Sequence, residues 1–306
     1  MDASRSRTQA SRLPASPGVY RFRDSSGRVL YLGRAVSLRR RVLSYWGDLR
    51  GRGHLAAMVA HIAQVEAVAS DSAHEAAWLE RNLLRSSLPP WNRCPDGGQE
   101  VEVWIRLRDS PRAPGLAVVH DRRPGDRVQY FGPYLGGQKV RDAVSGLSRV
   151  LPLAYTADLR AGTARDLARV RGASPADRAG LMRSVVAVLH RDPAAASLVR
   201  AELASRRGTA AAALSFEFAA KLQAEIEALD WITTEQKVTS QEPTDLDVYG
   251  WADGMLVQFA IRGGRLSGWS QRQCAEAGAR RYCGGTPAEW TTFAVRNASL
   301  AAKLAR

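Results

Sequence analysis

The chain has 306 residues, 45% of them hydrophobic and 24% charged, which is the balance of a globular protein with two or three domains of roughly 100–150 residues each. No apolar run approaches the roughly 20 residues that span a bilayer, and three cysteines are too few for a disulfide framework, so we expect a cytoplasmic protein without a membrane segment. Lysine and arginine number 44 against 30 acidic residues, a net charge of +14. This excess predicts a polyanionic partner, and nucleic acid is a commoner one than an anionic membrane.

After a polar arm at 2–12, residues 14–96 have the pattern of an α+β domain with the order ββααβα. The expected elements are strands over 17–22 and 28–33, helices over 38–45 and 55–63, a third strand over 65–69 and a helix from 72 to about 85. The last helix begins with a capping box, in which the Ser72 hydroxyl accepts a bond from the Glu75 amide and the Glu75 side chain reaches back. It ends before Pro89 and Pro90, and the segment 95–98 has the composition of a linker.

The rest of the chain divides by composition into three further segments. Residues 97–204 begin with strand-like alternation, pass through Tyr130-Phe-Gly-Pro-Tyr134 into a helix, and continue as an Ala/Arg-rich helical stretch. Residues 205–240 contain a long helical pattern over 210–232. After a polar linker at 239–245, residues 245–306 turn to strands joined by glycine-containing turns and end in a helix near 299–304.

Two short strings on the first two expected strands carry a family resemblance. Gly18-Val19-Tyr20 and Tyr31-Leu32-Gly33 resemble the two halves of the GIY-YIG nuclease motif, and the longer run from Tyr31 to Tyr45 is similar to the UvrC excinuclease family. The similarity continues in 79–84, in 91–92, in 130–134 and in 214–222, which resembles the UVR motif by which UvrC docks on UvrB. The resemblance implies an N-terminal GIY-YIG nuclease domain, an α/β connecting region, a UVR-like helical segment and a small β-rich C-terminal domain.

The resemblance also implies an active site built from the first domain. Its catalytic residues are expected to be Tyr20, Tyr31, Arg34, Arg41 and Asn92, and Glu80 is expected to bind one Mg²⁺ or Mn²⁺ ion. Tyr31 matches the tyrosine that takes a proton from the attacking water, and Arg41 matches the arginine that steadies the scissile phosphate. An ordinary tyrosine titrates near pH 10, so we expect neighbouring arginines to lower the pKa of Tyr31. One carboxylate suffices, because Mg²⁺ fills its other positions with water and phosphate oxygens.

Further residues are expected to bind partners. Arg39, Arg40 and Tyr45 are expected to contact damaged double-stranded DNA, which would place the protein at the bacterial nucleoid. The helix over 210–232 is expected to dock on a UvrB-like helicase subunit, which acts with UvrA upstream, through one apolar stripe. The residues of that stripe are Phe216, Glu217, Ala220, Leu222 and Ile226. The alternative is that this helix packs into the chain's own core.

Arg34 departs from the family pattern, which usually has lysine there, and its guanidinium is bulkier and cannot give up a proton at neutral pH. Two functions therefore stay open. The first is a metal-dependent DNA endonuclease of the UvrC type that makes a single incision, on the 3′ side of a lesion, in nucleotide excision repair. The second is a catalytically inactive UvrC-like protein that binds DNA or UvrB. A mobile-element or restriction nuclease is disfavoured, because such chains lack the 131–134 and UVR-like segments. No RNase H-like nuclease domain is expected, because no Asp-x-Ser-His string follows residue 245.

Overall fold

The computed structural model describes residues 2–47, 53–94, 101–123, 125, 127–159, 162–240 and 242–306. Its internal contacts group the chain into two units, Met1–Gln99 with Gln236–Arg306, and Glu100–Glu235. The grouping differs from the four expected segments, because the strands after residue 245 pack with the N-terminal domain and the UVR-like segment packs with the connecting region. The expected boundary between 96 and 97 and the linker at 95–98 lie outside the described residues.

The first sheet of the N-terminal unit contains the two halves of the GIY-YIG string. Its strands are β1 (Gly18–Arg23), β2 (Val29–Ala35) and β3 (Gln64–Ala69), in the antiparallel order β2-β1-β3. The register places Tyr20 opposite Gly33 on β2 and opposite Ala67 on β3. Because β1 is the central strand, nearly all of its side chains, including Tyr20, are buried, and Gly33 is buried opposite Tyr20 on the edge strand β2.

Helices from the same part of the chain pack on both faces of this sheet. They are α1 (Asp2–Ser11), α2 (Leu38–Leu43), α3 (Ala56–Val59) and α4 (Ala73–Ser86), with 3₁₀ turns at Ser44–Trp46 and Gly53–Leu55. The expected helix over 55–63 is shorter, because the chain turns after Val59 to bring Ala63 into a hydrogen bond with the Arg23 carbonyl. The polar arm forms α1, which is held by Gln9: its side chain accepts from the Val65 amide and donates to the Leu304 carbonyl.

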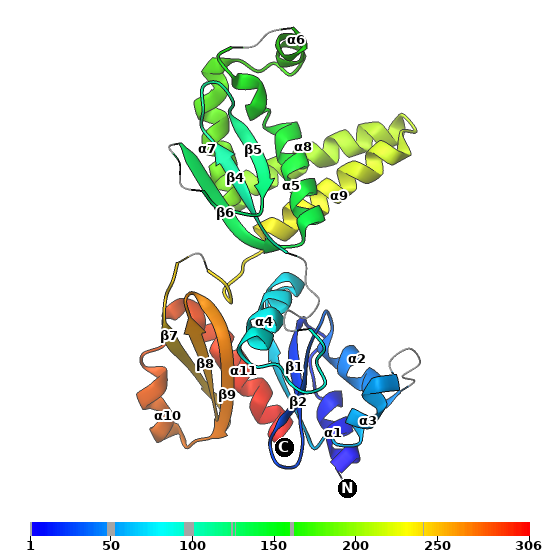
Figure 1. Ribbon diagram of the computed structural model, residues 1–306, viewed down its shortest axis with the longest axis vertical. Coiled ribbons are helices and arrows are strands. Elements are labelled where there is room, and N and C mark those ends of the chain that lie inside the picture. Colours follow the sequence, from blue (N-terminus) through cyan, green and yellow to red (C-terminus); the bar gives the residue numbers. More distant parts are fainter. Residues whose placement is uncertain are drawn as a thin grey trace. The chain divides into compact units, whose positions relative to one another are not determined.

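The second sheet of the same unit comes from the C-terminal end of the chain. Strands β7 (Leu246–Ala252), β8 (Met255–Arg262) and β9 (Arg265–Gln273) form an antiparallel meander, followed by α10 (Glu276–Cys283) and α11 (Ala288–Ala305). Helices α4 and α11 lie between the two sheets (Figure 1). The last turns of α11 place Leu300 and Leu304 in the same hydrophobic core as Tyr20 and Phe22. The N-terminal domain therefore buries part of its apolar surface against the C-terminal helix.

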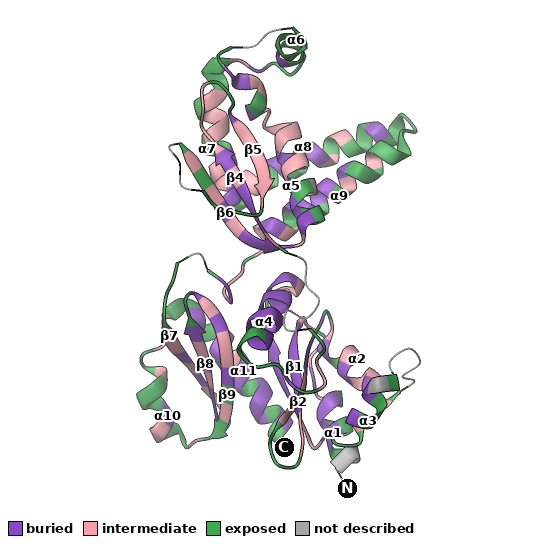
Figure 2. Ribbon diagram, in the orientation of Figure 1, coloured by how far each residue is buried: buried purple, intermediate pink, exposed green. Residues whose placement is uncertain are grey.

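The other unit is formed by Glu100–Glu235. Its sheet has the order β5-β4-β6, with β4 (Glu102–Arg108), β5 (Gly115–Val119) and β6 (Val128–Leu135). Its helices are α5 (Gly137–Val150), α6 (Thr163–Val170), α7 (Arg178–Leu189), α8 (Pro193–Ala212) and α9 (Phe216–Thr233). Helices α8 and α9 form a hairpin that packs on α5, and α9 is buried along only part of its surface (Figure 2). Among the described residues, no helix combines the length and apolar character needed to cross a bilayer.

Candidate active site

Three tyrosines form a cluster at the centre of the first unit. Tyr20 on β1 is fully buried, and its hydroxyl lies 2.7 Å from the Tyr45 hydroxyl. The ring centroids of Tyr20, Tyr31 and Tyr45 lie 5.9 to 6.2 Å from one another. Arg41 on α2 donates from Nε to the Tyr20 hydroxyl at 3.3 Å. The cluster thus connects both half-motifs of the sheet with the first helix that follows them.

The glycine of the second half-motif is required by this cluster. A Cβ atom at Gly33 would lie 2.7 Å from the Tyr20 hydroxyl oxygen and 2.8 Å from the Tyr31 ring, distances shorter than van der Waals contact. Any larger residue would push the Tyr20 ring away from Tyr45. The Tyr-x-Gly spacing therefore has a steric reason, in addition to its family resemblance.

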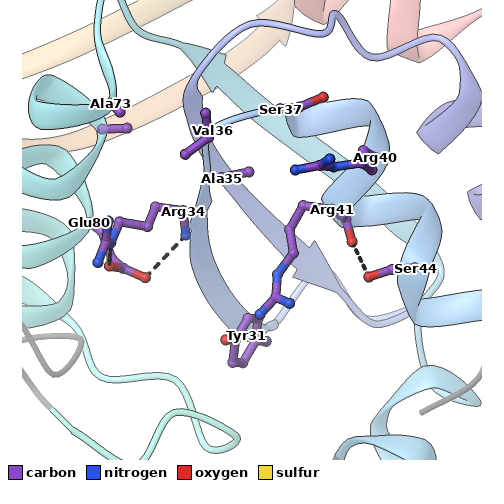
Figure 3. A pocket seen from close by; sticks show the side chains of 11 residues that line it. Tyr31, Arg34, Ala35, Val36, Ser37, Arg40, Arg41, Ser44, Ala73 and Glu80 are labelled. Carbon is purple, nitrogen blue, oxygen red and sulfur yellow. Dashed lines mark hydrogen bonds and ion pairs between the residues drawn. The ribbon is translucent and has the colours of Figure 1, made fainter. Parts of the chain in front are cut away.

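Beside the cluster, α4 presents a carboxylate to an open pocket of about 560 Å³. The Glu80 Oε1 accepts from the Arg34 backbone amide at 3.1 Å, and Oε2 accepts from the Arg34 Nε at 3.0 Å. Figure 3 shows Arg34 and Glu80 on one side of this pocket and Arg40 and Arg41 on the other, with Arg41 extended toward Tyr31. The lining residues are Tyr31, Arg34, Ala35, Val36, Ser37, Arg40, Arg41, Ser44, Ala73, Ala76 and Glu80. One acid and three arginines face the same space.

The electrostatics of Tyr31 differ from the expectation. Burial raises the pKa of Tyr31 above its ordinary value, and the neighbouring Tyr45 and Glu80 raise it further, while Arg41 lowers it by less. Burial also raises the pKa values of Tyr20 and Tyr45. The prediction that arginines lower the pKa of Tyr31 is therefore wrong for the site in this state, because the ring lies deep enough for desolvation to exceed the attraction of the guanidinium. All three hydroxyls are protonated near neutral pH.

Asn92 is not among the residues that line the pocket. Its Oδ1 accepts from the Leu32 amide at 2.9 Å, and its Nδ2 donates to the Leu32 carbonyl at 2.7 Å. The Trp91 amide donates to the Leu30 carbonyl, so the segment after α4 binds the outer edge of β2. Asn92 thereby holds the strand that carries Tyr31 and Arg34.

The three residues expected to contact DNA differ in how exposed they are. Arg39 and Arg40 are exposed on α2, and Arg39 also donates to the Leu13 carbonyl. Tyr45 is only 1% exposed, so its side chain does not face DNA and belongs to the tyrosine cluster instead. Leu38, Val42 and Tyr45 follow one another at helical spacing and all three are buried, a signal in the sequence that could have placed Tyr45 on the inner face.

The residues of α9 that were expected to bind a partner also differ in exposure. Phe216, Glu217 and Ala220 are exposed, whereas Leu222 and Ile226 lie in the hydrophobic core of their unit. The stripe prediction is wrong for Leu222 and Ile226, because that face of α9 packs on α5 and α8. The sequence also gave no indication of a buried ion pair on this face. Glu225, 1% exposed, accepts bonds from Ser145 and from two nitrogens of Arg149.

Comparison with known proteins places this geometry in a family. Residues 16–93 match the family model of the UvrC-like GIY-YIG domain, and the match contains the tyrosine cluster, the pocket and Glu80. Residues 16–93 are a UvrC-like GIY-YIG domain. The match confirms the GIY-YIG resemblance predicted from the sequence, and the structure itself shows the ββααβα order.

Similarity to UvrC proteins extends well beyond the GIY-YIG domain. The chain is 31% identical to the UvrABC system protein C of Chlorobaculum tepidum, with 84% of this chain and 43% of that protein covered. It is 35% identical to the same protein of Mycobacterium sp. (strain KMS), with 90% and 44% covered. The chain thus spans less than half the length of these relatives. The chain also matches a crystal structure of the GIY-YIG N-terminal endonuclease domain of UvrC from Thermotoga maritima bound to magnesium. The sequence identity is 28% and the TM-score is 0.27, and the match covers 28% of this chain and 94% of that chain.

Proposed function

We propose that this protein is a metal-dependent endonuclease of the UvrC type, which cuts damaged double-stranded DNA in nucleotide excision repair. The observation that carries the proposal is the pocket of the GIY-YIG domain, where Glu80, Tyr31 and Arg41 face one open space. Phosphodiester hydrolysis requires a carboxylate that binds a cation, a hydroxyl that contacts the attacking water and a guanidinium that binds the phosphate. The net charge of +14 suits a polyanionic substrate.

The donor set of the pocket fits one hard divalent cation. Among the residues that the structure describes, no three His, Cys, Asp or Glu side chains come together as a metal cage, and Glu80 is the single acid in the pocket lining. Mg²⁺ commonly binds through one or two carboxylates and keeps water and phosphate oxygens in its other positions. We therefore propose that Glu80 holds one Mg²⁺ or Mn²⁺ ion. Such an ion, when bound, neutralises negative charge on the reacting phosphate.

The other pocket residues supply orientation. The Arg41 guanidinium, aimed into the pocket, can bind two phosphate oxygens with its planar fork, and its Nε bond to Tyr20 fixes its direction. Tyr31 presents a hydroxyl that can accept a hydrogen bond from the attacking water. Because burial keeps Tyr31 protonated, proton acceptance by this residue requires added positive charge next to Glu80. Arg34 holds the Glu80 carboxylate on the side of the pocket opposite Arg41.

The side of the incision and the partner protein are proposed from the family resemblance and from the exposure of residues at the start of α9. We propose that the site makes one incision, on the 3′ side of the lesion. We also propose that a UvrB-like helicase subunit, loaded by UvrA, docks on the exposed start of α9 around Phe216, Glu217 and Ala220. The support is the exposure of these side chains, with Phe216 66% exposed, and their position within the UVR-like string 214–222. Large apolar side chains exposed on one helical face are typical of a helix that binds a partner.

A nicking assay tests the proposal. Purified protein is incubated with an end-labelled, lesion-bearing duplex and Mg²⁺ or Mn²⁺, with and without UvrA and UvrB. Wild type should give a single 3′-side product, and Glu80→Ala should give none while it still binds DNA. Glu276→Ala, which removes an exposed acid on α10, serves as the control that should nick normally. Full activity of Glu80→Ala would reject the metal assignment.

The catalytically inactive DNA- or UvrB-binding protein is the second candidate. One observation favours it: both oxygens of Glu80 already accept hydrogen bonds from Arg34. In the same assay this candidate predicts binding of the duplex without any nick, in wild type as in Glu80→Ala. A metal-dependent nick by wild type would eliminate it.

A further inference from the structure

Helix α4 makes different contacts on two of its faces. One face lines the pocket with Ala73, Ala76 and Glu80. The other face carries Glu75, Asn82 and Ser86, spaced by seven and four residues, which at about 100° per residue lie within roughly 40° of one another. Glu80 is about 140° from Glu75 around the same axis. Any contact that fixes the second face therefore also fixes the direction in which Glu80 points.

The second face is bound by the short segment 236–239, which follows unit Glu100–Glu235 in the chain. Glu75 accepts from the Lys237 amide at 2.9 Å. Asn82 donates from Nδ2 to the Val238 carbonyl at 3.1 Å and to the Thr239 hydroxyl at 3.0 Å. Glu75 is 0% and Asn82 4% exposed, so water cannot replace these bonds without structural change.

Additional bonds hold the ends of the helix. At the start, the second Glu75 oxygen accepts from the Asp71 amide at 2.7 Å. At the end, the Ser86 hydroxyl donates to the Ser267 carbonyl of β9 at 2.8 Å. The contacts of this face therefore come largely from residues after 235, more than 150 positions away from α4 in the sequence. Every residue of His74–Leu84 is buried, so the central turns of α4 are covered by protein except where Glu80, 7% exposed, borders the pocket.

We propose that the segment 236–239 sets the rotation of α4, and that Asn82 and Glu75 are positioning residues for the Glu80 carboxylate. The proposal rests on the proposed function in taking a divalent cation as the ligand of Glu80. The side chain reaches roughly 6 Å from the helix axis, so a rotation of about 10° moves the carboxylate by about 1 Å. A displacement of that size lowers the rate of a positioned reaction by about a hundredfold.

The test compares Asn82→Ala with wild type in the full chain. We expect kcat for nicking to fall by about 10- to 100-fold, with KM for the duplex within about twofold, because the exposed arginines of α2 are unchanged. Mn²⁺ titrated without DNA, followed by calorimetry, should bind more weakly than to wild type. Thr239→Val, which removes only one acceptor of Asn82, should shift both quantities in the same direction by less, and it keeps the test valid if Asn82→Ala does not fold.

Gln9→Ala is the matched control. Gln9 is also a buried amide with two backbone bonds in the same unit, so its loss lowers the melting temperature without touching α4. Its kcat and Mn²⁺ affinity should equal those of wild type. If wild type nicks DNA and binds Mn²⁺, and Asn82→Ala matches Gln9→Ala in both quantities, the positioning proposal is wrong and the proposed function stands. If wild type binds no Mn²⁺, both are wrong. If wild type binds Mn²⁺ without nicking and Asn82→Ala binds it more weakly, the positioning stands alone.

Discussion

Replacing Arg34 with alanine is expected to strengthen cation binding at Glu80 by about fivefold. A divalent ion that binds Glu80 has to displace the guanidinium whose Nε lies 3.0 Å from Oε2. The Arg34 backbone amide, 3.1 Å from Oε1, is retained in the alanine variant. The substitution therefore removes only the side-chain competitor and leaves the backbone contact that orients the carboxylate.

The magnitude follows from the exposure of the pair. The Arg34 side chain is 43% exposed and the Glu80 side chain 9%, so solvent screens only one partner of the ion pair. The free energy of the pair therefore lies near the upper end of the range for surface ion pairs, at about 1 kcal/mol. Because 1.4 kcal/mol corresponds to a factor of ten in affinity, about 1 kcal/mol corresponds to about fivefold in Kd. Arg34→Lys should fall between wild type and alanine, since an ammonium keeps the charge but loses the directed Nε bond.

Mn²⁺ titration of the DNA-free protein, read by calorimetry or by the loss of free-ion paramagnetic signal, measures the effect. Arg40→Ala is the control, because Arg40 lines the same pocket and its removal takes away an equal charge. The difference in Kd between the two variants isolates the direct competition. An Arg34→Ala protein that binds Mn²⁺ no more tightly than Arg40→Ala would refute the reasoning.

Three further predictions concern stability and DNA binding. Glu225→Ala should lower the free energy of unfolding of its unit by about 1–3 kcal/mol in a urea titration, because Arg149, whose side chain is 17% exposed, loses its ion-pair partner. Because the pKa values of Tyr20 and Tyr45 are raised, their contribution to stability should be constant below about pH 10, the unfolded value. Above it stability should fall, as unfolded tyrosines ionise while folded ones stay protonated; guanidinium melts at pH 8 and 11 measure this. DNA affinity should fall with salt at a logarithmic slope of roughly −4 to −5, reduced by about 1 in Arg40→Ala, and a slope near zero would contradict phosphate binding.

Local patterns predicted the parts of the site that depend on neighbours in sequence. The Ser72 hydroxyl accepts from the Glu75 amide as the capping box requires, and the strands carrying Tyr20 and Tyr31 pair as a hairpin. The Glu75 carboxylate, however, accepts from the Asp71 and Lys237 amides, and the second of these lies 162 residues away. No window of sequence contains that partner.

The same limit explains the helix that the sequence did not predict. Helix α1 is polar and lacks strong apolar periodicity, and it is stabilised by Gln9 bonds to the Val65 amide and to the Leu304 carbonyl, 295 residues away. Tyr45 and Leu222 were misplaced for a related reason. An apolar residue on a helical face indicates that the face is covered, but the pattern does not say whether the cover is another molecule or the chain's own core.

The interruption of the first unit by Glu100–Glu235 has a consequence for synthesis on the ribosome. Helix α4 emerges early, whereas the segment 236–239 and the C-terminal strands that complete its environment follow only after the whole second unit. At about 5–20 residues per second this delay is on the order of ten seconds. During that interval the nascent chain exposes the faces of α4 and β3 that α11 and β9 later cover. The second unit can fold in the meantime, so the surroundings of Glu80 are completed only after residues 236–306 have been synthesised.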